Sequence, residues 1–333
     1  MALTDSAHVR VGVVGAGVVG ARAAETLAAL GAGEVVVQDE RPEAAAALAA
    51  RLGGPVRATD PCAAAVDAVL VATPAPQHEV AARFVDAGIG VACACDDVSD
   101  VRALVGLDGR ARAAGVAIVV GAAAAPGLTG LLAARLAGGM EVVDEVHVAM
   151  HGTGGPECSL QHHRALAGQS VGWHDGQWLR RPAGSGRELC WFPEPVGGRD
   201  CYRVEHPDPL LLHRAMPHLA RITARMAATR RDRLVARLPM LIPPFAEGGV
   251  GAVRVEVRGR RGGGRCTEIL GVAERVGQLA GIVAAVAAAT IARAGFGRPG
   301  VHVLGAADGP HASMLAQVES LGVRVQEFVG SQG

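Results

Sequence analysis

Short apolar runs alternate with helix-like segments through the first third of the chain. The runs lack the period-two alternation of a half-exposed strand, so each predicts a strand covered on both faces. Such an alternation predicts a right-handed, doubly wound parallel sheet. The predicted strands cover residues 9–14, 35–39, 68–72, 89–95 and 116–120, and a short one begins at Val56. The predicted helices begin near Val18 and cover residues 42–52, 79–87 and 98–114.

The pattern changes after Ala125. An apolar helix ending near Leu136, a strand over 142–150, and two alternating strands over 251–258 and 266–272 predict an α+β domain with a mixed sheet. The Gly- and Arg-rich residues 259–265 predict a hairpin loop, and residues 274–294 a long helix. A strand near 301–304, a helix near 312–321 and a strand over 323–328 follow.

These patterns divide the chain into three predicted parts. Residues 1–125 form a dinucleotide-binding Rossmann domain, and residues 126–272 form an α+β domain for substrate binding and oligomerisation. Residues 273–333 add a helix and a small α/β element that pack back on the first domain. The predicted fold class is therefore α/β: an N-terminal Rossmann sheet followed by a mixed-sheet domain.

The turn after the first strand carries a phosphate-binding pattern, G-x-G-x-x-G. Gly15 permits the tight turn, Gly17 lets the backbone approach a pyrophosphate, and Gly20 allows the helix to pack closely on the strand. A helix N-terminus offers free N–H groups and a partial positive charge to phosphates. The predicted coenzyme-binding residues in this turn are Gly15, Ala16, Gly17, Val18, Val19 and Gly20.

The identity of the dinucleotide depends on the end of the second strand. Asp39 favours NAD, because a carboxylate accepts hydrogen bonds from the ribose hydroxyls and repels a 2′-phosphate. Arg41 could instead accommodate that phosphate, or be a solvated residue at a helix start. NAD is thus the predicted coenzyme, with NADP possible. Thr73 and Pro74, after the fourth strand, either line the nicotinamide ribose or simply end that strand.

The charge balance and the cysteine count limit the kinds of partner and the cell compartment that we expect for this protein. The 333 residues carry 32 basic and 32 acidic side chains, so no charge excess points to nucleic acid or an anionic membrane. The residues before the first strand do not resemble a signal peptide, and an odd count of seven cysteines predicts reduced thiols in the cytoplasm. No C-x-x-C pair occurs, and we expect no metal site.

Every basic side chain is Arg, since the sequence contains no Lys. This excludes a Lys Schiff base, a Walker A lysine and the Tyr-x-x-x-Lys pair of short-chain dehydrogenases. Any proton transfer must therefore use His, Asp, Glu, Cys, Tyr or water.

Three motifs in this order resemble the saccharopine dehydrogenase-like family. They are Gly15–Gly20, Ala72-Thr73-Pro74 and Ala124-Ala125-Pro126-Gly127-Leu128-Thr129. Glu274-Arg275, at a returning helix, adds to the likeness. The resemblance implies an NAD(P)-binding domain with an inserted mixed-sheet domain, an active site in the cleft between them, and oxidation or reduction of a C–N bond in an amino-acid derivative. The missing lysine departs from family members that use one for proton transfer.

Candidate substrate residues lie at strand ends and in Gly-rich segments. His151 ends a predicted strand and is either the catalytic acid–base group or a hydrogen-bonded loop histidine. Arg187 and Arg199, in segments predicted as loops, could bind a substrate carboxylate, or be exposed structural residues. Asp96, which follows the fifth strand, completes the predicted substrate-binding set.

Other polar residues are weaker candidates. His78 is a capping or surface histidine or approaches the coenzyme, and Tyr202 lacks a lysine neighbour that would lower its pKa. His162 and His163 are adjacent, so on a helix they face apart and do not easily share one metal ion.

The sequence thus leaves two functions open. The first is an NAD(P)-dependent oxidoreductase that transfers a hydride to or from a small molecule, with no nucleic-acid or membrane partner, as a homodimer. The second is a non-catalytic dinucleotide-binding sensor or assembly partner.

Overall fold

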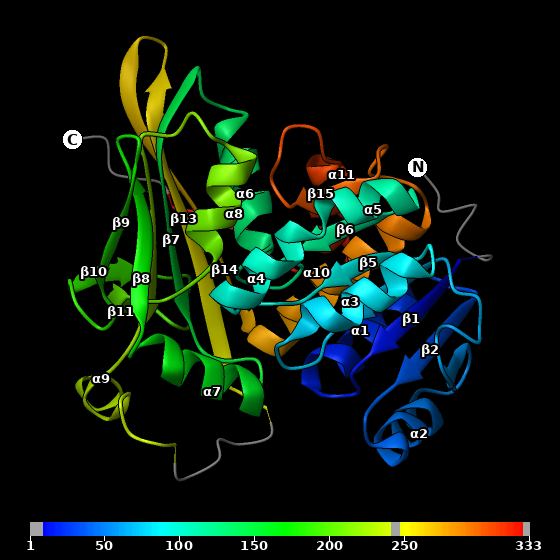
Figure 1. The fold of residues 1–333 in the computed structure, drawn as a ribbon. Coiled ribbons are helices and arrows are strands. Elements are labelled where there is room, and N and C mark those ends of the chain that lie inside the picture. The colour runs from blue at the N-terminus through cyan, green and yellow to red at the C-terminus, as the bar shows by residue number, and fades with distance from the viewer. Residues whose placement is uncertain (1–8, 241–246, 329–333) are drawn as a thin grey trace. The chain divides into compact units, whose positions relative to one another are not determined.

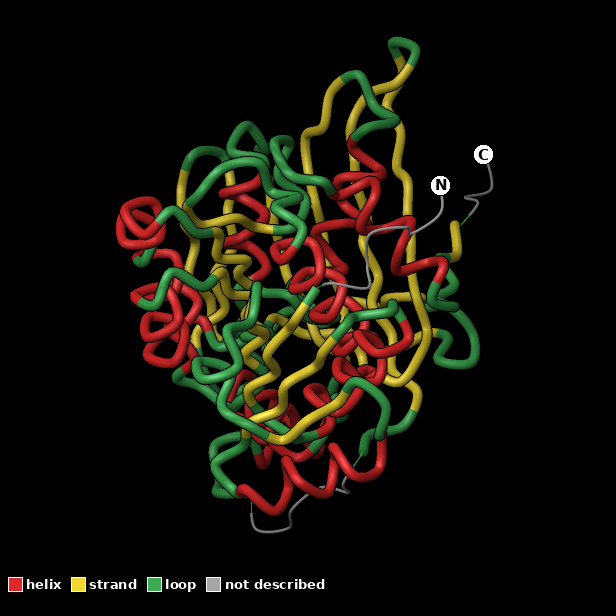
Figure 2. The backbone as a smooth tube through the Cα atoms, turned by 90° about the vertical axis from the view of Figure 1, so that its right-hand side faces the viewer, coloured by secondary structure: helices red, strands yellow, loops and turns green. Residues whose placement is uncertain are grey.

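A computed structural model describes residues 9–240 and 247–328, and these residues form two compact units. Unit 1 comprises the described residues up to Ala123 together with Gly277–His302 and Asp308–Pro310. Unit 2 comprises the remaining described residues. Figures 1 and 2 show the strands and helices of each unit.

The C-terminal segment divides differently from the expected single element over 273–333. Its long helix belongs to unit 1, whereas its last helix and strand belong to unit 2. Two contacts within unit 2 explain the difference. The last strand pairs with a neighbouring strand through Leu270 and Glu327, and Arg135 forms an ion pair with Glu319 of the last helix, 2.7 Å apart.

Unit 1 is built on a seven-stranded sheet in the order β15-β6-β5-β4-β1-β2-β3. Strands β1 to β6 pair in parallel, so the predicted doubly wound sheet is confirmed. Their buried Val, Leu and Ala side chains account for the continuous apolar runs. The strands are β1 Arg10–Val14, β2 Glu34–Gln38, β3 Val56–Ala58, β4 Ala68–Val71, β5 Gly90–Cys93, β6 Ala117–Val120 and β15 Gly300–Val303.

The helices of unit 1 follow the strands in alternation. They are α1 Val18–Ala29, α2 Pro42–Leu52, α3 Gln77–Asp86, α4 Val98–Gly106, α5 Asp108–Ala114 and α10 Val276–Ala292. The single helix predicted over 98–114 is wrong, because the chain breaks into α4 and α5 at Leu107. There the Leu107 N–H donates to the carbonyl of Leu104, three residues earlier, which tightens the last turn of α4.

Helix α10 is apolar around most of its circumference and is buried for most of its length. It lies against α1, where Gly281 leaves room for the backbone and side chain of Arg22 and for Ala23. A Cβ at Gly281 would lie 2.5 Å from the Arg22 Cβ and 2.9 Å from the Ala23 nitrogen. Among the described residues, no helix has both the length and the apolarity needed to cross a bilayer.

Unit 2 contains a nine-stranded mixed sheet, as the sequence predicts. Its main order is β10-β11-β12-β7-β13-β14-β16, while β8 pairs with β12 and β9. Strands β7 and β12 pair in parallel, and the other strand pairs described for this sheet are antiparallel. The strands are β7 Val142–His151, β8 Gln169–His174, β9 Gln177–Pro182, β10 Glu188–Trp191, β11 Gly198–Arg203, β12 Arg221–Ala227, β13 Val250–Arg261, β14 Gly264–Arg275 and β16 Gln326–Glu327.

Two sequence predictions in this sheet are wrong. The seven-residue loop over 259–265 is a two-residue turn at Gly262 and Gly263, whose φ angles of +58° and +77° suit a tight hairpin. The segment of Arg199, predicted as a loop, lies in β11, because Gly198–Trp191 and Arg199–Cys190 pairs join it to β10.

The helices of unit 2 pack around the sheet and its connections. They are α6 Leu128–Ala137, α7 Pro156–Ala165, α8 Asp208–Ala215, α9 Arg230–Val235 and α11 His311–Ser320. Val146, Val148 and Met150 alternate along β7 as its buried side chains. His151, the last residue of that strand, lies on the opposite, half-buried face.

A pair of Gly→Ala substitutions in unit 1 tests the packing of α10. We expect Gly281→Ala to lower the free energy of unfolding by about 1–3 kcal/mol, because the added methyl group overlaps α1. Gly106→Ala, at the end of α4, meets no atom within 4 Å and should be neutral or stabilise by about 0.4–1 kcal/mol. Urea denaturation of both variants measures the difference, and equal losses would refute the tight α1–α10 contact.

Candidate dinucleotide-binding site

The three glycines of the turn between β1 and α1 have different surroundings. Gly15 has a φ of +107°, and a Cβ there would lie 2.6 Å from the Ala72 carbonyl oxygen. A Cβ at Gly20 would clash with the Gly15 carbonyl oxygen, so only Gly lets α1 pack this closely. Gly17 meets no atom within 4 Å. Two glycines therefore build the turn, and the third leaves open space beside it.

That open space lies at the start of α1. The helix begins at Val18, directly after Gly17, and its first turn has no acidic residue and no side-chain cap. The first N–H groups of a helix have no partner within the helix and attract anions. The amides that begin at Val18 can therefore hold a phosphate group next to Gly17.

Asp39 ties the neighbouring loop to this turn. The Ala16 N–H donates to Asp39 Oδ2 at 2.7 Å, and the Arg41 N–H donates to Asp39 Oδ1 at 2.9 Å. The Asp39 side chain is only 13% exposed, while the Arg41 side chain is 72% exposed and its Nε lies 3.7 Å from Asp39 Oδ1. The carboxylate predicted to bind the ribose thus also holds the glycine turn in place, and Arg41 is free to reorient.

Thr73 and Pro74 lie on the loop that touches the same turn. Gly15 lies against Ala72 and the Thr73 backbone. The side chain of Gln77 holds this loop in place, because its Nε2 donates to the carbonyl oxygens of Thr73, at 2.7 Å, and Ala94, at 3.2 Å. The Thr73 hydroxyl oxygen is buried and has no hydrogen-bond partner in the described part of the chain. The predicted coenzyme residues of unit 1 are therefore brought together at the carboxyl edge of one sheet.

A buried carboxylate next to this loop was not predicted from the sequence. Asp100, in the first turn of α4, accepts from the Gln77 N–H at 2.6 Å and from the Cys95 thiol at 3.2 Å through Oδ2. Its Oδ1 accepts from the His78 N–H at 3.0 Å and contacts His78 Nδ1 at 2.6 Å. Asp100 therefore caps the start of α3 and joins the loops that follow β4 and β5.

The environment of Asp100 also sets the state of Cys95. Burial raises the pKa of the Cys95 thiol, and the nearby charge of Asp100 raises it further. Cys95 therefore stays protonated and donates to Asp100. His78 is held with Nδ1 toward the Asp100 carboxylate, so Asp100 caps the helix start and the His78 imidazole does not.

In unit 2, two of the predicted substrate residues influence one another. Burial lowers the pKa of His151, and the charge of Arg199 lowers it further. The His151 ring lies 6.3 Å from the ring of Phe192. Arg187 has a different partner, since its Nε lies 2.9 Å from Asp200 Oδ2 on an exposed part of the unit. The charge of Arg199 thus acts on His151, whereas Arg187 forms an ion pair with Asp200.

The remaining candidates have structural roles that the sequence did not show. Tyr202 is buried beneath Arg233, whose guanidinium carbon lies 4.1 Å from the ring centre. His163 Nε2 bonds to the Leu238 carbonyl at 2.7 Å, whereas His162 Nε2 lies 3.6 Å from Cys158 Sγ. The two histidines therefore face apart, as predicted. Asp96 lies in the loop between β5 and α4, and its role in substrate binding stays a prediction.

Comparisons with known proteins agree with this geometry. Residues 10–88 match the model of the family described as NADP oxidoreductase coenzyme F420-dependent. The chain matches no curated protein sequence. Among solved structures, apo saccharopine dehydrogenase (L-Glu forming) from Saccharomyces cerevisiae superposes with a TM-score of 0.70 at 15% identity, covering 96% of this chain and 100% of that one. The fold is that of saccharopine dehydrogenase.

A second solved structure shares the arrangement more loosely. An engineered D-amino acid dehydrogenase bound to NADP⁺ matches with a TM-score of 0.50 at 14% identity, covering 90% of this chain and 93% of that one. The predicted likeness to the saccharopine dehydrogenase-like fold is therefore confirmed, and the family match supports NAD(P) binding by residues 10–88. These matches support the predicted oxidoreductase class.

Two glycines of the turn provide a test that separates binding from folding. Gly17→Ala should change the free energy of unfolding by less than about 1 kcal/mol, because its surroundings are open, but should weaken NAD(H) binding by crowding the pyrophosphate. Gly20→Ala should destabilise the protein, because its methyl group meets the Gly15 carbonyl. Fluorescence titration with NADH and thermal denaturation measure the two effects. Unchanged coenzyme affinity in a folded Gly17→Ala variant would contradict the assignment.

Proposed function

We propose that this protein is an NAD(P)-dependent oxidoreductase that transfers a hydride to or from a small molecule. The observation that carries the proposal is the open position at Gly17, next to an uncapped helix start and the Asp39 carboxylate. The family match over residues 10–88 and the saccharopine dehydrogenase fold support it. The nicotinamide would supply the redox chemistry, while the chain binds it, orients it and moves protons.

For the coenzyme, the carboxylate of Asp39 favours NAD. Its side chain is held by two backbone N–H groups, so it cannot swing away from a 2′-phosphate without breaking the turn. The exposed Arg41 leaves NADP as the other coenzyme the site could take.

For the substrate, we propose an imine or amine of an amino-acid derivative. The name of the yeast relative and that of the engineered D-amino acid dehydrogenase support this class. His151 would exchange the proton or orient a polar substrate atom, and Arg199 would bind a carboxylate. Because its pKa is lowered, His151 is mainly neutral at pH 7 and can accept a proton. Asp96 and Arg187 remain proposed substrate residues, and Arg187 would have to leave Asp200 to act.

We further propose that the protein is a cytoplasmic homodimer. The odd number of cysteines supports the location. The long β13–β14 hairpin supports self-association, because β14 extends beyond Leu270 and Gly271, which pair with β16, and offers strand edge to a second copy. Sedimentation at micromolar concentration tests the dimer, and a single 33.8 kDa species would refute it.

The coenzyme preference is tested by two substitutions of one residue. Asp39→Ala removes a charged acceptor and should weaken NAD binding by about 1.5–3 kcal/mol, with a smaller loss for NADP. Asp39→Asn keeps an acceptor for the Ala16 N–H, so it isolates the charge and should shift the preference toward NADP. Calorimetric titration with both coenzymes measures this, and equal losses for NAD and NADP in both variants would overturn the role of Asp39.

The proton-transfer role is tested at His151. A panel of amino-acid imines and amines, followed by the near-ultraviolet absorbance of the reduced nicotinamide, first identifies a substrate. His151→Asn should then lower turnover by about 10²–10⁴ and leave coenzyme affinity unchanged. Coenzyme binding without turnover on any panel member would favour a sensor instead.

Because the charge of Arg199 lowers the pKa of His151, the pH dependence of the rate also tests the role of these two residues. The wild-type rate of the direction that needs a base should rise with pH through the lowered pKa of His151 and level off above it. Arg199→Gln removes one cause of the lowering, so the inflection should move to higher pH. A profile that is unchanged in both the Arg199 and the His151 variants would remove this pair from the reaction.

A further inference from the structure

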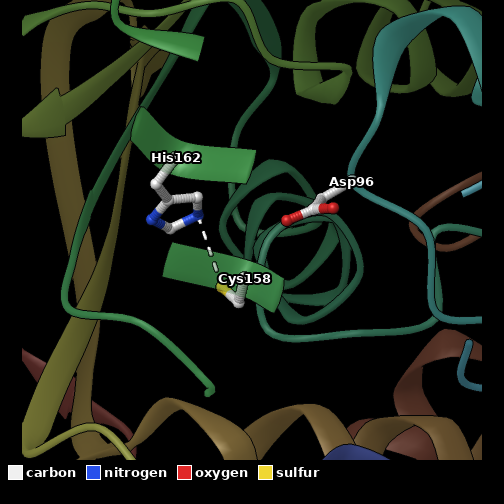
Figure 3. Close-up of side chains that lie close together, drawn as sticks. All are labelled: Asp96, Cys158 and His162. Atoms are coloured by element: carbon white, nitrogen blue, oxygen red, sulfur yellow. Dashed lines mark hydrogen bonds between the residues drawn. The ribbon is translucent and has the colours of Figure 1, made fainter. Parts of the chain in front are cut away.

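Helix α7 carries a thiol and an imidazole on one face. Cys158 and His162 are four residues apart, so they lie one above the other on consecutive turns. Cys158 Sγ lies 3.6 Å from His162 Nε2 (Figure 3). Both side chains are partly accessible.

This separation is the one that a tetrahedral metal ion imposes on two of its ligands. Zn–S bonds of about 2.3 Å and Zn–N bonds of about 2.05 Å, at a tetrahedral angle, place sulfur and nitrogen about 3.6 Å apart. The pair would therefore need little movement of either side chain to bind one ion. Thiolate and imidazole are also the ligand types that favour zinc-like divalent ions over magnesium or calcium.

The two histidines of this helix have different neighbours. Cys158 is the third residue of the ten-residue helix and lies about one turn before His162. His163, the next residue along from His162, is instead held by the Leu238 carbonyl. His162 thus lies beside the Cys158 thiol, and His163 bonds to Leu238.

We propose that Cys158 and His162 form a binding site for a zinc-type divalent cation. Binding exchanges the thiol proton for a metal–sulfur bond: the proton leaves to solvent, and the neutral imidazole contributes the lone pair of Nε2. Water or a small oxygen or nitrogen ligand fills the remaining positions. The site differs from the sequence expectation of no metal.

Cobalt(II) is the probe for this site, because a thiolate–cobalt bond gives a near-ultraviolet charge-transfer band. Titration of the reduced, metal-free full-length chain should produce this band with one Co²⁺ per chain, and Zn²⁺ should abolish it. Cys158→Ser should remove the band, and His162→Gln should weaken Co²⁺ binding by on the order of tenfold or more. Apparent affinity should rise with pH, since binding releases a proton.

Two matched controls make the result specific. His163→Gln changes the adjacent histidine, and Cys62→Ser changes an exposed cysteine, so neither should alter the titration. Circular dichroism confirms that each variant is folded. No band at millimolar Co²⁺, or a band that survives in Cys158→Ser, would overturn the site and leave the pair as a simple hydrogen bond. Because the readout needs neither coenzyme nor substrate, its failure would leave the proposed oxidoreductase function untouched.

Discussion

The close approach of α1 to β1 is the constraint on which the coenzyme site depends. Only a residue without a Cβ fits at position 20, because the Gly15 carbonyl oxygen occupies that space. This contact lets the helix begin immediately after the strand, with its first amides directed into the open region at Gly17. Asp39 then fixes the turn by accepting from the Ala16 N–H. The close packing at Gly20 therefore places the proposed phosphate site next to the proposed ribose site.

A second buried interaction stabilises the far side of the site. Asp100 receives two backbone N–H groups at the start of α3 and the Cys95 thiol from the loop after β5. Gln77, held by this arrangement, bonds to the carbonyls of Thr73 and Ala94. The loops that follow β4 and β5 are thus joined by side chains rather than by strand pairing. This explains how a loop of Pro and Ala residues presents Thr73 in a defined position.

The parts of the fold that were predictable are those encoded locally. The apolar runs and the spacing of Gly15, Gly17, Gly20 and Asp39 predict the parallel sheet and its turn, because strand burial and turn geometry act over a few residues. The two-residue turn at Gly262 was missed because its flanking Arg and Gly residues resemble a loop, although they pair across the hairpin.

The rest depends on contacts distant in sequence. Nothing near Asp100 shows that it meets Gln77 and His78, 22 or more residues away. Similarly, Arg187 looked like a carboxylate-binding residue, and its pairing with Asp200 arises only when β10 and β11 align. The four-residue spacing of Cys158 and His162 predicts that they lie side by side, but only if their segment is known to be helical.

The central claim is that the β1–α1 turn binds the pyrophosphate of a nicotinamide dinucleotide. A crystal structure of the full chain with NADH tests it most directly. We expect pyrophosphate oxygens within hydrogen-bond distance of the amides at Val18 and Val19, next to Gly17, and ribose hydroxyls donating to Asp39. NADH bound elsewhere, or an empty turn in crystals grown with saturating NADH, would contradict it.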